Sequence, residues 1–290
     1  MPPNRTKRCF PNSGPILSVK LEDEIIRKLT LLVTKYNPEI HHYPKRECLG
    51  LYAGPTSVAY VFFYFAQSSK YKDTIVEGKK CAVWSQLYLD AANRVAVSDE
   101  ILSEEDATHG GLIDGQETNS MHCGIINDEL ARAAVCAVLT KDSKYSDILL
   151  GYLSKILDGG SKYDEVVYGR TGYLFFLRLV NHYMPDTIPK TAYKQVIDVI
   201  LSHPPWLFYG SLPYLGVGHG WAGIFLEIVL CDPSYAQQVQ PYIEQMLDQQ
   251  LESKNWPSNI HSSPPDGTEN SERKDDDILV QWVKSYNFLR

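Results

Sequence analysis

The amino-acid sequence predicts an all-α protein, an α/α toroid in which an inner ring of buried helices is wrapped by an outer ring of amphipathic helices. Three observations support this prediction. Apolar residues recur at helical spacing, alternating strand patterns are few, and four glycine-bearing loops each precede a helix that is apolar nearly all round. A helix without a polar face must be buried on all sides. A closed double layer provides that burial, whereas a flat solenoid leaves each repeated helix one solvent-exposed face.

The four loops form a weak internal repeat. They are Gly50–Gly54, Cys123–Glu129, Gly169–Gly172 and Gly218–Gly223. The apolar helices predicted after them cover Val58–Ala66, Leu130–Leu139, Tyr173–Val180 and Ala222–Leu230. The last two loop-to-loop intervals suit one helical hairpin per repeat, and the longer first interval leaves room for an insertion around Ser98–Ser120. We therefore expect roughly the first four hairpin repeats of a toroid.

The helices expected between these repeats are amphipathic. One covers Leu21–Val33, and another covers Ile148–Leu157 and ends at Gly159-Gly160, as a C-cap does. A further helix is opened by Thr187 and Pro189, because proline is favoured in a first helical turn. Its apolar face carries Tyr193, Val196, Ile197 and Ile200.

The composition divides the chain near residue 251. We expect residues 1–251 to be the N-terminal portion of the toroid and residues 252–277, rich in Ser, Pro, Asn and Asp, to be a polar linker. Residues 278–290 begin a further apolar element with an aberrant end. The sequence thus predicts an incomplete toroid.

Charge and composition exclude several classes of protein. The 290 residues carry 28 Lys and Arg against 35 Asp and Glu, a net charge of −7, without a basic stripe for nucleic acid. No apolar run approaches the roughly 20 residues of a membrane span, and no secretory leader opens the chain. The six cysteines are scattered singly, as reduced thiols are. We expect a cytoplasmic protein, with peripheral association at the plasma membrane as an alternative.

Two loop motifs carry a resemblance to a known family. Tyr168-Gly-Arg-Thr-Gly-Tyr-Leu174 and Leu215-Gly-Val-Gly-His-Gly-Trp-Ala-Gly-Ile224 resemble signature loops of the lanthionine synthetase C-like family, in its eukaryotic branch. The resemblance covers roughly Phe10–Trp282 and implies a double-layered α/α barrel. It also implies zinc-dependent addition of a thiol, from a peptide cysteine or glutathione, to dehydroamino acids in peptides or proteins. The expected partners are therefore glutathione or a dehydroamino-acid peptide.

The resemblance is interrupted where the family binds zinc. Family members hold the metal with two cysteines and a histidine from later Cys-His-Gly loops, the first of which follows a Trp. Here Ile278–Trp282 matches the approach, and Val283–Arg290 then replaces the expected Cys-His-Gly. We therefore expect a C-terminally truncated family member that has no zinc or other cofactor of its own and is inactive in thiol addition.

His219 and Asp128 are the candidate catalytic residues. His219 lies between two glycines at the start of a buried helix and matches the family's motif histidine, a proposed acid/base. The alternative is a loop histidine that hydrogen-bonds a neighbouring turn. Bacterial family members use an aspartate from the loop that holds Asp128 here. An ordinary N-cap for the helix from Leu130 is the alternative for Asp128.

Arg170 and the loop glycines complete the candidate site. Arg170 is the candidate substrate-binding residue, for an anionic group, although bracing of adjacent loops is the favoured role. A metal site at His122 and Cys123 lacks a third ligand nearby and is disfavoured. We expect five loop glycines to permit positive φ and close helix approach: Gly169, Gly172, Gly218, Gly220 and Gly223.

Two other functions remain open. The first is a non-catalytic scaffold that binds glutathione, membrane or signalling proteins. The second is a carbohydrate enzyme of the six-hairpin glycosidase type, which shares the α/α toroid. Glycoside hydrolysis needs two carboxylates across the mouth of the barrel, and only Asp128 and Glu129 lie in a loop of the right kind.

Overall fold

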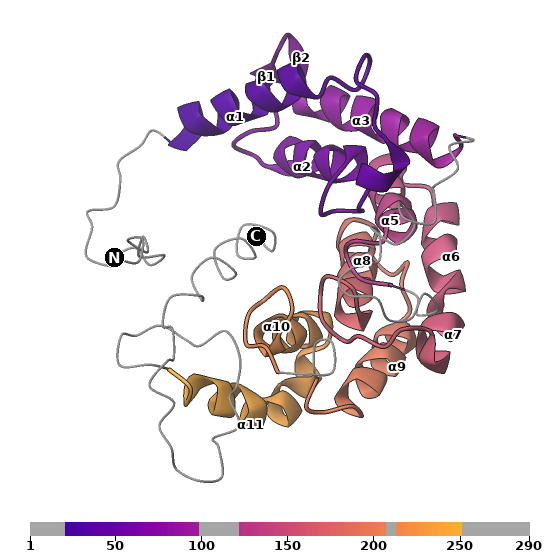
Figure 1. The fold of residues 1–290 in the computed structure, drawn as a ribbon, viewed down its shortest axis with the longest axis vertical. Helices are drawn as coiled ribbons and strands as arrows, with labels where there is room; N and C mark the ends of the chain where they lie inside the picture. Colours follow the sequence, from indigo (N-terminus) through magenta and orange to yellow (C-terminus); the bar gives the residue numbers. More distant parts are fainter. Residues whose placement is uncertain (1–20, 99–121, 207–212, 251–290) are drawn as a thin grey trace, which may run out of the picture.

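The described helices form a two-layered arc. The computed structural model describes residues 21–98, 122–206 and 213–250. Four helices line the inside of the arc (Figure 1): α2 (Pro55–Gln67), α5 (Asp128–Thr140), α8 (Arg170–Tyr183) and α10 (Trp221–Cys231). The outer layer contains α1 (Leu21–Lys35), α3 (Cys81–Ala96), α6 (Lys144–Gly151), α7 (Leu153–Lys155), α9 (Lys190–Leu201) and α11 (Ala236–Leu247).

Each inner helix packs against the outer helix that follows it. The pairs are α2 with α3, α5 with α6, α8 with α9, and α10 with α11, and the inner helices also contact their inner neighbours in chain order. Short turns complete the chain path: η1 (Lys45–Glu47), η2 (Ile156–Gly160) and η3 (Pro233–Tyr235). This arrangement confirms the all-α prediction of inner and outer helical layers.

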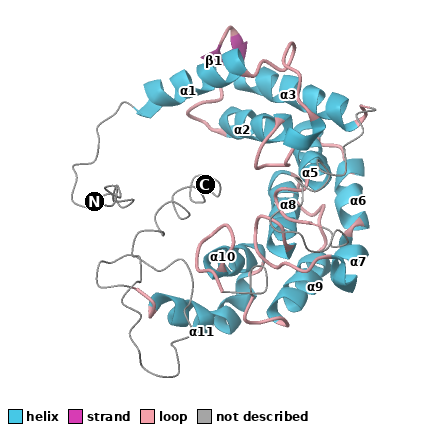
Figure 2. Cartoon of the chain, viewed as in Figure 1, coloured by secondary structure: helices cyan, strands magenta, loops and turns pink. Residues whose placement is uncertain are grey.

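Strand structure is minor in the described residues, as Figure 2 shows. The two-stranded hairpin of β1 (Ile75–Val76) and β2 (Lys79–Lys80) pairs Ile75 with Lys80 and Val76 with Lys79. It leads directly into α3, where the indole N–H of Trp84 donates to the carbonyl of Val76 at 2.7 Å. The hairpin therefore anchors the start of an outer helix.

The predicted helix at Ile148–Leu157 is divided. The structure has α6 and α7 there, followed by the wider π turn of η2, which leaves helical geometry at Asp158 and at Gly159 with φ of 83°. Glycine reaches this left-handed conformation without a steric penalty. The end of the segment at these glycines therefore agrees with the prediction, and the single straight helix does not.

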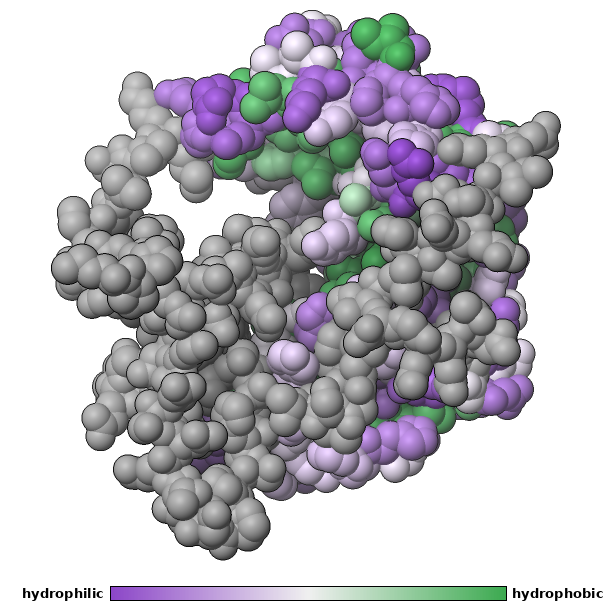
Figure 3. Space-filling view, viewed as in Figure 1, coloured by the Kyte–Doolittle hydropathy of each residue, from purple (hydrophilic) through white to green (hydrophobic). Residues whose placement is uncertain are grey.

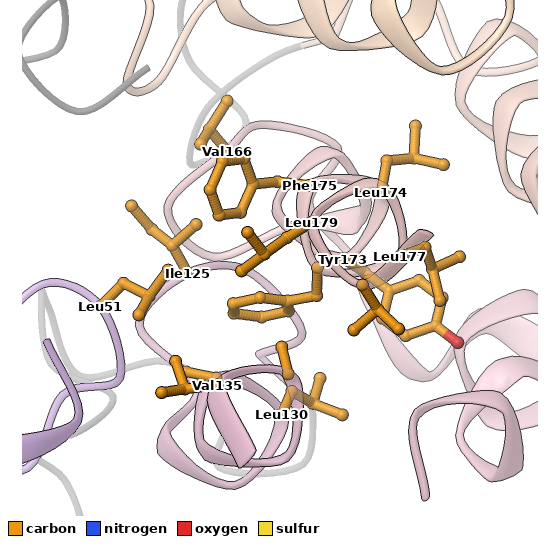
Figure 4. Close-up of a cluster of buried hydrophobic side chains, with 14 of the residues drawn as sticks. Leu51, Ile125, Leu130, Val135, Val166, Tyr173, Leu174, Phe175, Leu177 and Leu179 are labelled. Atoms are coloured by element: carbon orange, nitrogen blue, oxygen red, sulfur yellow. The ribbon is translucent and has the colours of Figure 1, made fainter. Parts of the chain in front are cut away.

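The core lies between the two layers and extends along the inner helices. Figure 4 shows part of it, where side chains of α8 meet those of α5 and of the loops at Leu51, Ile125 and Val166. Most residues of α5 and α8 are buried. Burial of apolar surface on this scale is the main stabilising contribution to such a fold.

The inner helices α2 and α10 are buried less completely than the sequence predicts. Phe62 and Phe225 are inaccessible between the layers, but Tyr64 of α2 is 45% exposed and Leu226 of α10 is 41% exposed. Helices α5 and α8 each lie between two inner neighbours, whereas α2 and α10 have one among the described elements. Apolar surface accordingly appears on the inner side of the arc (Figure 3).

Some expectations concern parts of the chain outside the described residues. The predicted boundary at residue 251, the linker at 252–277 and the element at 278–290 all lie there. Among the helices of residues 21–98, 122–206 and 213–250, none combines the length and the apolar content that crossing a bilayer requires.

Candidate functional site

The four glycine-bearing loops converge, each on the next. The N–H of Leu51 donates to the carbonyl of Ile125 at 2.8 Å, and the N–H of Ile125 donates to the carbonyl of Val166 at 3.0 Å. The last loop packs closely on Val166, because a Cβ atom added to Gly223 would lie only 2.8 Å from Cγ2 of Val166. Loops that precede separate inner helices therefore contact one another in chain order along the arc, as their common position in the sequence predicts.

The loop glycines are needed for close packing. A Cβ on Gly169 or on Gly220 would come within 2.5 Å of a neighbouring backbone carbonyl, and Gly172 and Gly223 are equally crowded. In the described residues, glycines with positive φ are Gly50, Gly54, Gly78 and Gly159. The expectation of positive φ at Gly169, Gly172, Gly218, Gly220 and Gly223 is therefore wrong. Close backbone approach, the other part of the expectation, accounts for the crowded glycines: at Gly169 and Gly220 the crowding atoms belong to the glycine's own loop, and at Gly172 they include the neighbouring loop at Gly124.

Asp128 is the first residue of α5 and lies against α2. Its Oδ1 accepts a hydrogen bond from the Thr56 hydroxyl at 2.8 Å, and its Oδ2 lies 3.7 Å from Nε of Arg132. Burial raises the pKa of the Asp128 carboxyl, and the hydrogen bond from Thr56 opposes that shift. Asp128 is not the N-cap. Asn127, with an extended backbone, caps the helix by accepting from the N–H of Leu130 at 2.9 Å.

His219 lies in the turn before α10 and faces a carboxylate from another loop. Its Nδ1 is 3.1 Å from Oε2 of Glu165. The imidazole stacks on the ring of Tyr168, with 5.8 Å between the centroids and 17° between the planes. The side chain of His219 is 28% exposed, whereas that of Glu165 is 4% exposed. The histidine is thus held on one side by a buried carboxylate and an aromatic face while part of its ring reaches solvent.

A second histidine extends this aromatic group. The ring of His122 is 5.1 Å from that of Tyr168 and is stacked 6.0 Å from that of Tyr163. Burial lowers the pKa of His122, so the neutral imidazole is favoured there. The two histidines, carried by different loops, therefore both lie against the ring of Tyr168.

Arg170 is buried and engaged by protein groups. Its Nη1 is 2.7 Å from Oδ1 of Asp164, its Nη2 donates to the carbonyl of Ser161 at 2.6 Å, and its Nε donates to the carbonyl of Ile156 at 3.3 Å. The residue is 4% exposed. Through these contacts Arg170 braces the loop before α8. Because its guanidinium is already engaged by protein groups, we do not propose an anion-binding role for Arg170.

The convergent loops fall inside a family match. Residues 48–283 match the model of the family described as lanthionine synthetase C-like protein, which is most of the chain. The chain belongs to the lanthionine synthetase C-like family. The two helical layers of the arc are those of the all-α toroid that this family implies.

The lanthionine synthetase C-like family implies a bound zinc ion, but the described residues do not provide a set of zinc ligands. The thiol of Cys123 is fully buried, and burial raises its pKa to about 12, so it stays protonated and is a poor metal ligand. No group of three or more His, Cys, Asp or Glu is placed to hold a metal ion within the described ranges. We therefore derive no step through a metal from these residues.

Glu165 is the site residue that the sequence analysis missed. The adjacent acids Asp164 and Glu165 reach different partners, because Asp164 pairs with Arg170 and Glu165 faces His219. Two acidic residues directly before the apolar Val166-Val167 and the glycine loop were the available signal, since buried carboxylates require partners. The partner of Glu165, however, lies 54 residues away in the sequence.

Replacing Asp128 with asparagine is expected to make stability depend less on pH. Because burial raises the pKa of Asp128 in the folded state, the folded protein binds more protons than the unfolded chain just above the unfolded pKa of about 3.9. The contribution of Asp128 to stability is therefore lost as pH rises through its folded pKa. The asparagine side chain would keep the Thr56 hydrogen bond and remove this loss.

Urea unfolding of the wild type, Asp128→Asn and a control variant over a pH series from about 2.5 to 7 measures the difference. Asp232→Asn is the control of opposite sign, because hydrogen bonds from Ser234 lower the pKa of Asp232. Its contribution is present at neutral pH and is lost as pH falls. Parallel curves for the wild type and Asp128→Asn would contradict the assignment of a raised pKa to Asp128.

Proposed function

We propose that this chain carries the proton-transfer part of a site that adds a thiol to a dehydroamino acid in a peptide or protein. The thiol comes from a peptide cysteine or from glutathione. The observation that supports this role best is the His219 imidazole, held by Glu165 and Tyr168 in a loop that lies within the family match and resembles a family motif.

The reaction requires such a group. When a thiolate attacks the β-carbon of a dehydroalanine, a carbon–sulfur bond forms, and the electron pair of the double bond moves into an enolate. The α-carbon must then receive a proton. Imidazole gives and takes protons near neutral pH, and a positioned general acid typically contributes 10²- to 10⁴-fold to the rate. His219, partly exposed at the start of α10, is the proposed donor.

Asp128 is a second proton carrier in this proposal. It lies on the adjacent convergent loop, and its raised pKa lets the carboxyl keep its proton at a higher pH than an exposed aspartate does. Its hydrogen bond with Thr56 holds it against α2. We rank it below His219, because Thr56 and Arg132 both oppose the rise in the pKa of Asp128 and so favour its charged form.

Formation of the thiolate is the part that the described residues do not supply. In the family a zinc ion that coordinates the thiol performs this task. The Cys-His-Gly sequence expected of the family's zinc loops does not occur in these 290 residues. We therefore propose that the 290-residue polypeptide by itself does not add thiols to dehydroamino acids.

The expected result with purified protein is no zinc and no adduct. Elemental analysis after dialysis against a mild chelator measures the metal. Mass spectrometry of a dehydroalanine peptide incubated with glutathione measures addition. Near-stoichiometric zinc together with adduct formation would overturn the proposed inactivity.

A zinc-supplemented protein tests His219. Fusing the zinc-binding segment of a family member after Trp282 is expected to produce adduct, and His219→Ala in that fusion should reduce the rate by at least about 100-fold. His182→Ala, which removes an exposed imidazole at the end of α8, is the matched control and should leave the rate unchanged. Equal rates in the His219 and His182 variants would refute the catalytic role of His219.

Non-catalytic binding is a second candidate function. It is favoured by the apolar side chains that α2 and α10 expose, such as Tyr64 and Leu226. This candidate would be supported if the 290-residue chain binds glutathione and the His219→Ala variant binds it equally well. The glycosidase alternative rested on Asp128 and Glu129, and it is not carried forward, because both residues begin the same helix, α5, rather than lying across the barrel mouth from each other.

A further inference from the structure

The Glu165 carboxylate is fully engaged at the junction of two loops. Its Oε1 accepts the N–H of Tyr168 at 2.6 Å, and its Oε2 accepts the N–H of Val167 at 2.7 Å. The same Oε2 lies 3.1 Å from Nδ1 of His219. Three donors from two loops therefore converge on one buried side chain. The two backbone bonds orient the carboxylate before it meets the histidine.

This geometry selects one form of the imidazole. A carboxylate accepts hydrogen bonds and donates none, and a neutral imidazole carries its proton on either Nδ1 or Nε2. The contact with Glu165 is a hydrogen bond only when the proton is on Nδ1. The lone pair is then on Nε2, the nitrogen on the opposite side of the ring from the buried carboxylate.

We infer that Glu165 is a positioning residue that holds neutral His219 as the Nδ1–H tautomer, so that Nε2 is the nitrogen that takes up a proton and then, in the imidazolium, donates it to the α-carbon of the substrate. The catalytic consequence rests on the proposed function, whereas the tautomer does not. Tyr168 contributes to the same end, because its ring covers one face of the imidazole while its backbone N–H holds the carboxylate.

The three-donor arrangement explains why a glutamate is required. Glutamine has the same length but offers one oxygen and one NH₂ group, so it loses at least one of the three hydrogen bonds in either orientation. If its NH₂ group faces His219, it donates to Nδ1 and favours the opposite tautomer. Aspartate keeps both oxygens but is one methylene shorter, and it would pull back from the ring.

Nitrogen NMR of the imidazole tests the inference directly. The 290-residue protein is labelled with ¹⁵N-histidine, and ring signals are recorded at a pH high enough for the imidazoles to be neutral. The signals that disappear in His219→Gln identify His219. We expect a protonated Nδ1 and an unprotonated Nε2 in the wild type. A protonated Nε2 in the wild type would overturn the inference, even if no Glu165 variant folds.

Variants provide the second measurement. Glu165→Gln should move His219 away from the Nδ1–H form. Glu227→Gln is the matched control, because Glu227 is another buried carboxylate, paired with Arg178 at 2.5 Å, and should leave the His219 signals unchanged. Glu165→Leu leaves no group that can accept from Nδ1, so an unaltered His219 pattern in a folded Glu165→Leu protein would also overturn the inference.

Kinetics separate this inference from the proposed function. In the zinc-supplemented fusion, Glu165→Gln should lower kcat by at least about tenfold, with little change in KM. This is part of the roughly 10²- to 10⁴-fold that a positioned general acid contributes. If His219→Ala leaves the rate of addition unchanged while the tautomer is as expected, the proposed function fails and the positioning stands. In a fusion whose activity depends on His219, an unchanged kcat in the Glu165→Gln variant would refute the catalytic consequence.

Discussion

Replacing Gly172 with alanine is expected to destabilise the folded protein by about 4 kcal/mol or more. A Cβ at this position would lie 2.1 Å from the carbonyl oxygen of Val166, 2.5 Å from Cα of Gly124 and 2.6 Å from the nitrogen of Ile125. All three are backbone atoms, which cannot change rotamer to make room. The loops before α5 and α8 would have to separate, breaking the hydrogen bond between Ile125 and Val166.

Gly151→Ala is the matched control for this substitution. Gly151 ends α6, and nothing lies within 4 Å of the Cβ that alanine would add. Alanine has the higher helix propensity, so this variant should be stabilised by up to about 1 kcal/mol. Equilibrium unfolding in urea measures both changes. A Gly172→Ala protein within about 1 kcal/mol of wild type would show that the loop junction yields easily.

Replacing Arg170 with methionine is expected to cost about 3–5 kcal/mol of stability. Methionine keeps much of the side-chain volume but leaves the carboxylate of Asp164 buried without its cation. It also leaves the carbonyls of Ser161 and Ile156 without their guanidinium donors. An uncompensated buried charge is among the few defects that destabilise a protein this strongly.

The defect should become smaller as pH falls. Burial already raises the pKa of Asp164, and the attraction of Arg170 opposes that shift, so the Arg170→Met substitution should raise the pKa of Asp164 further. A carboxyl with a raised folded pKa contributes stability that is present at low pH and is lost as pH rises through that pKa. Once protonated, Asp164 needs no counter-ion. Urea unfolding at pH 4.5 and pH 7.5 should therefore show the larger loss at pH 7.5.

Two further variants define the origin of the Arg170 effect. Lys194→Met removes an exposed ion pair in which Nζ of Lys194 lies 2.8 Å from Oδ2 of Asp198. This substitution should change stability little, because water screens such pairs. The double variant Arg170→Met, Asp164→Asn should recover part of the loss, since the unpaired charge is gone. Equal effects of Arg170→Met and Lys194→Met would exclude a role for buried charge.

The sequence by itself determined the helical layers, because the burial of a helix face is recorded in local periodicity. The outer helix α9 is an example: Tyr193, Val196, Ile197 and Ile200 were predicted to form its apolar face, and all four are buried. The glycine loops before apolar helices are also local features of the sequence, and in the structure these loops contact one another. The family motif with His219 lies on one of these loops.

Only the tertiary structure decided which groups meet. Glu165 and His219 belong to loops of different hairpins, and no pattern of spacing links residues 54 positions apart. The same holds for the crowding at Gly172, which depends on the neighbouring loop at Gly124. Apolar content also could not show that α5 is covered on both sides while α2 exposes Tyr64. Periodicity specifies that a face is buried, whereas its partner depends on how the hairpins pack around the arc.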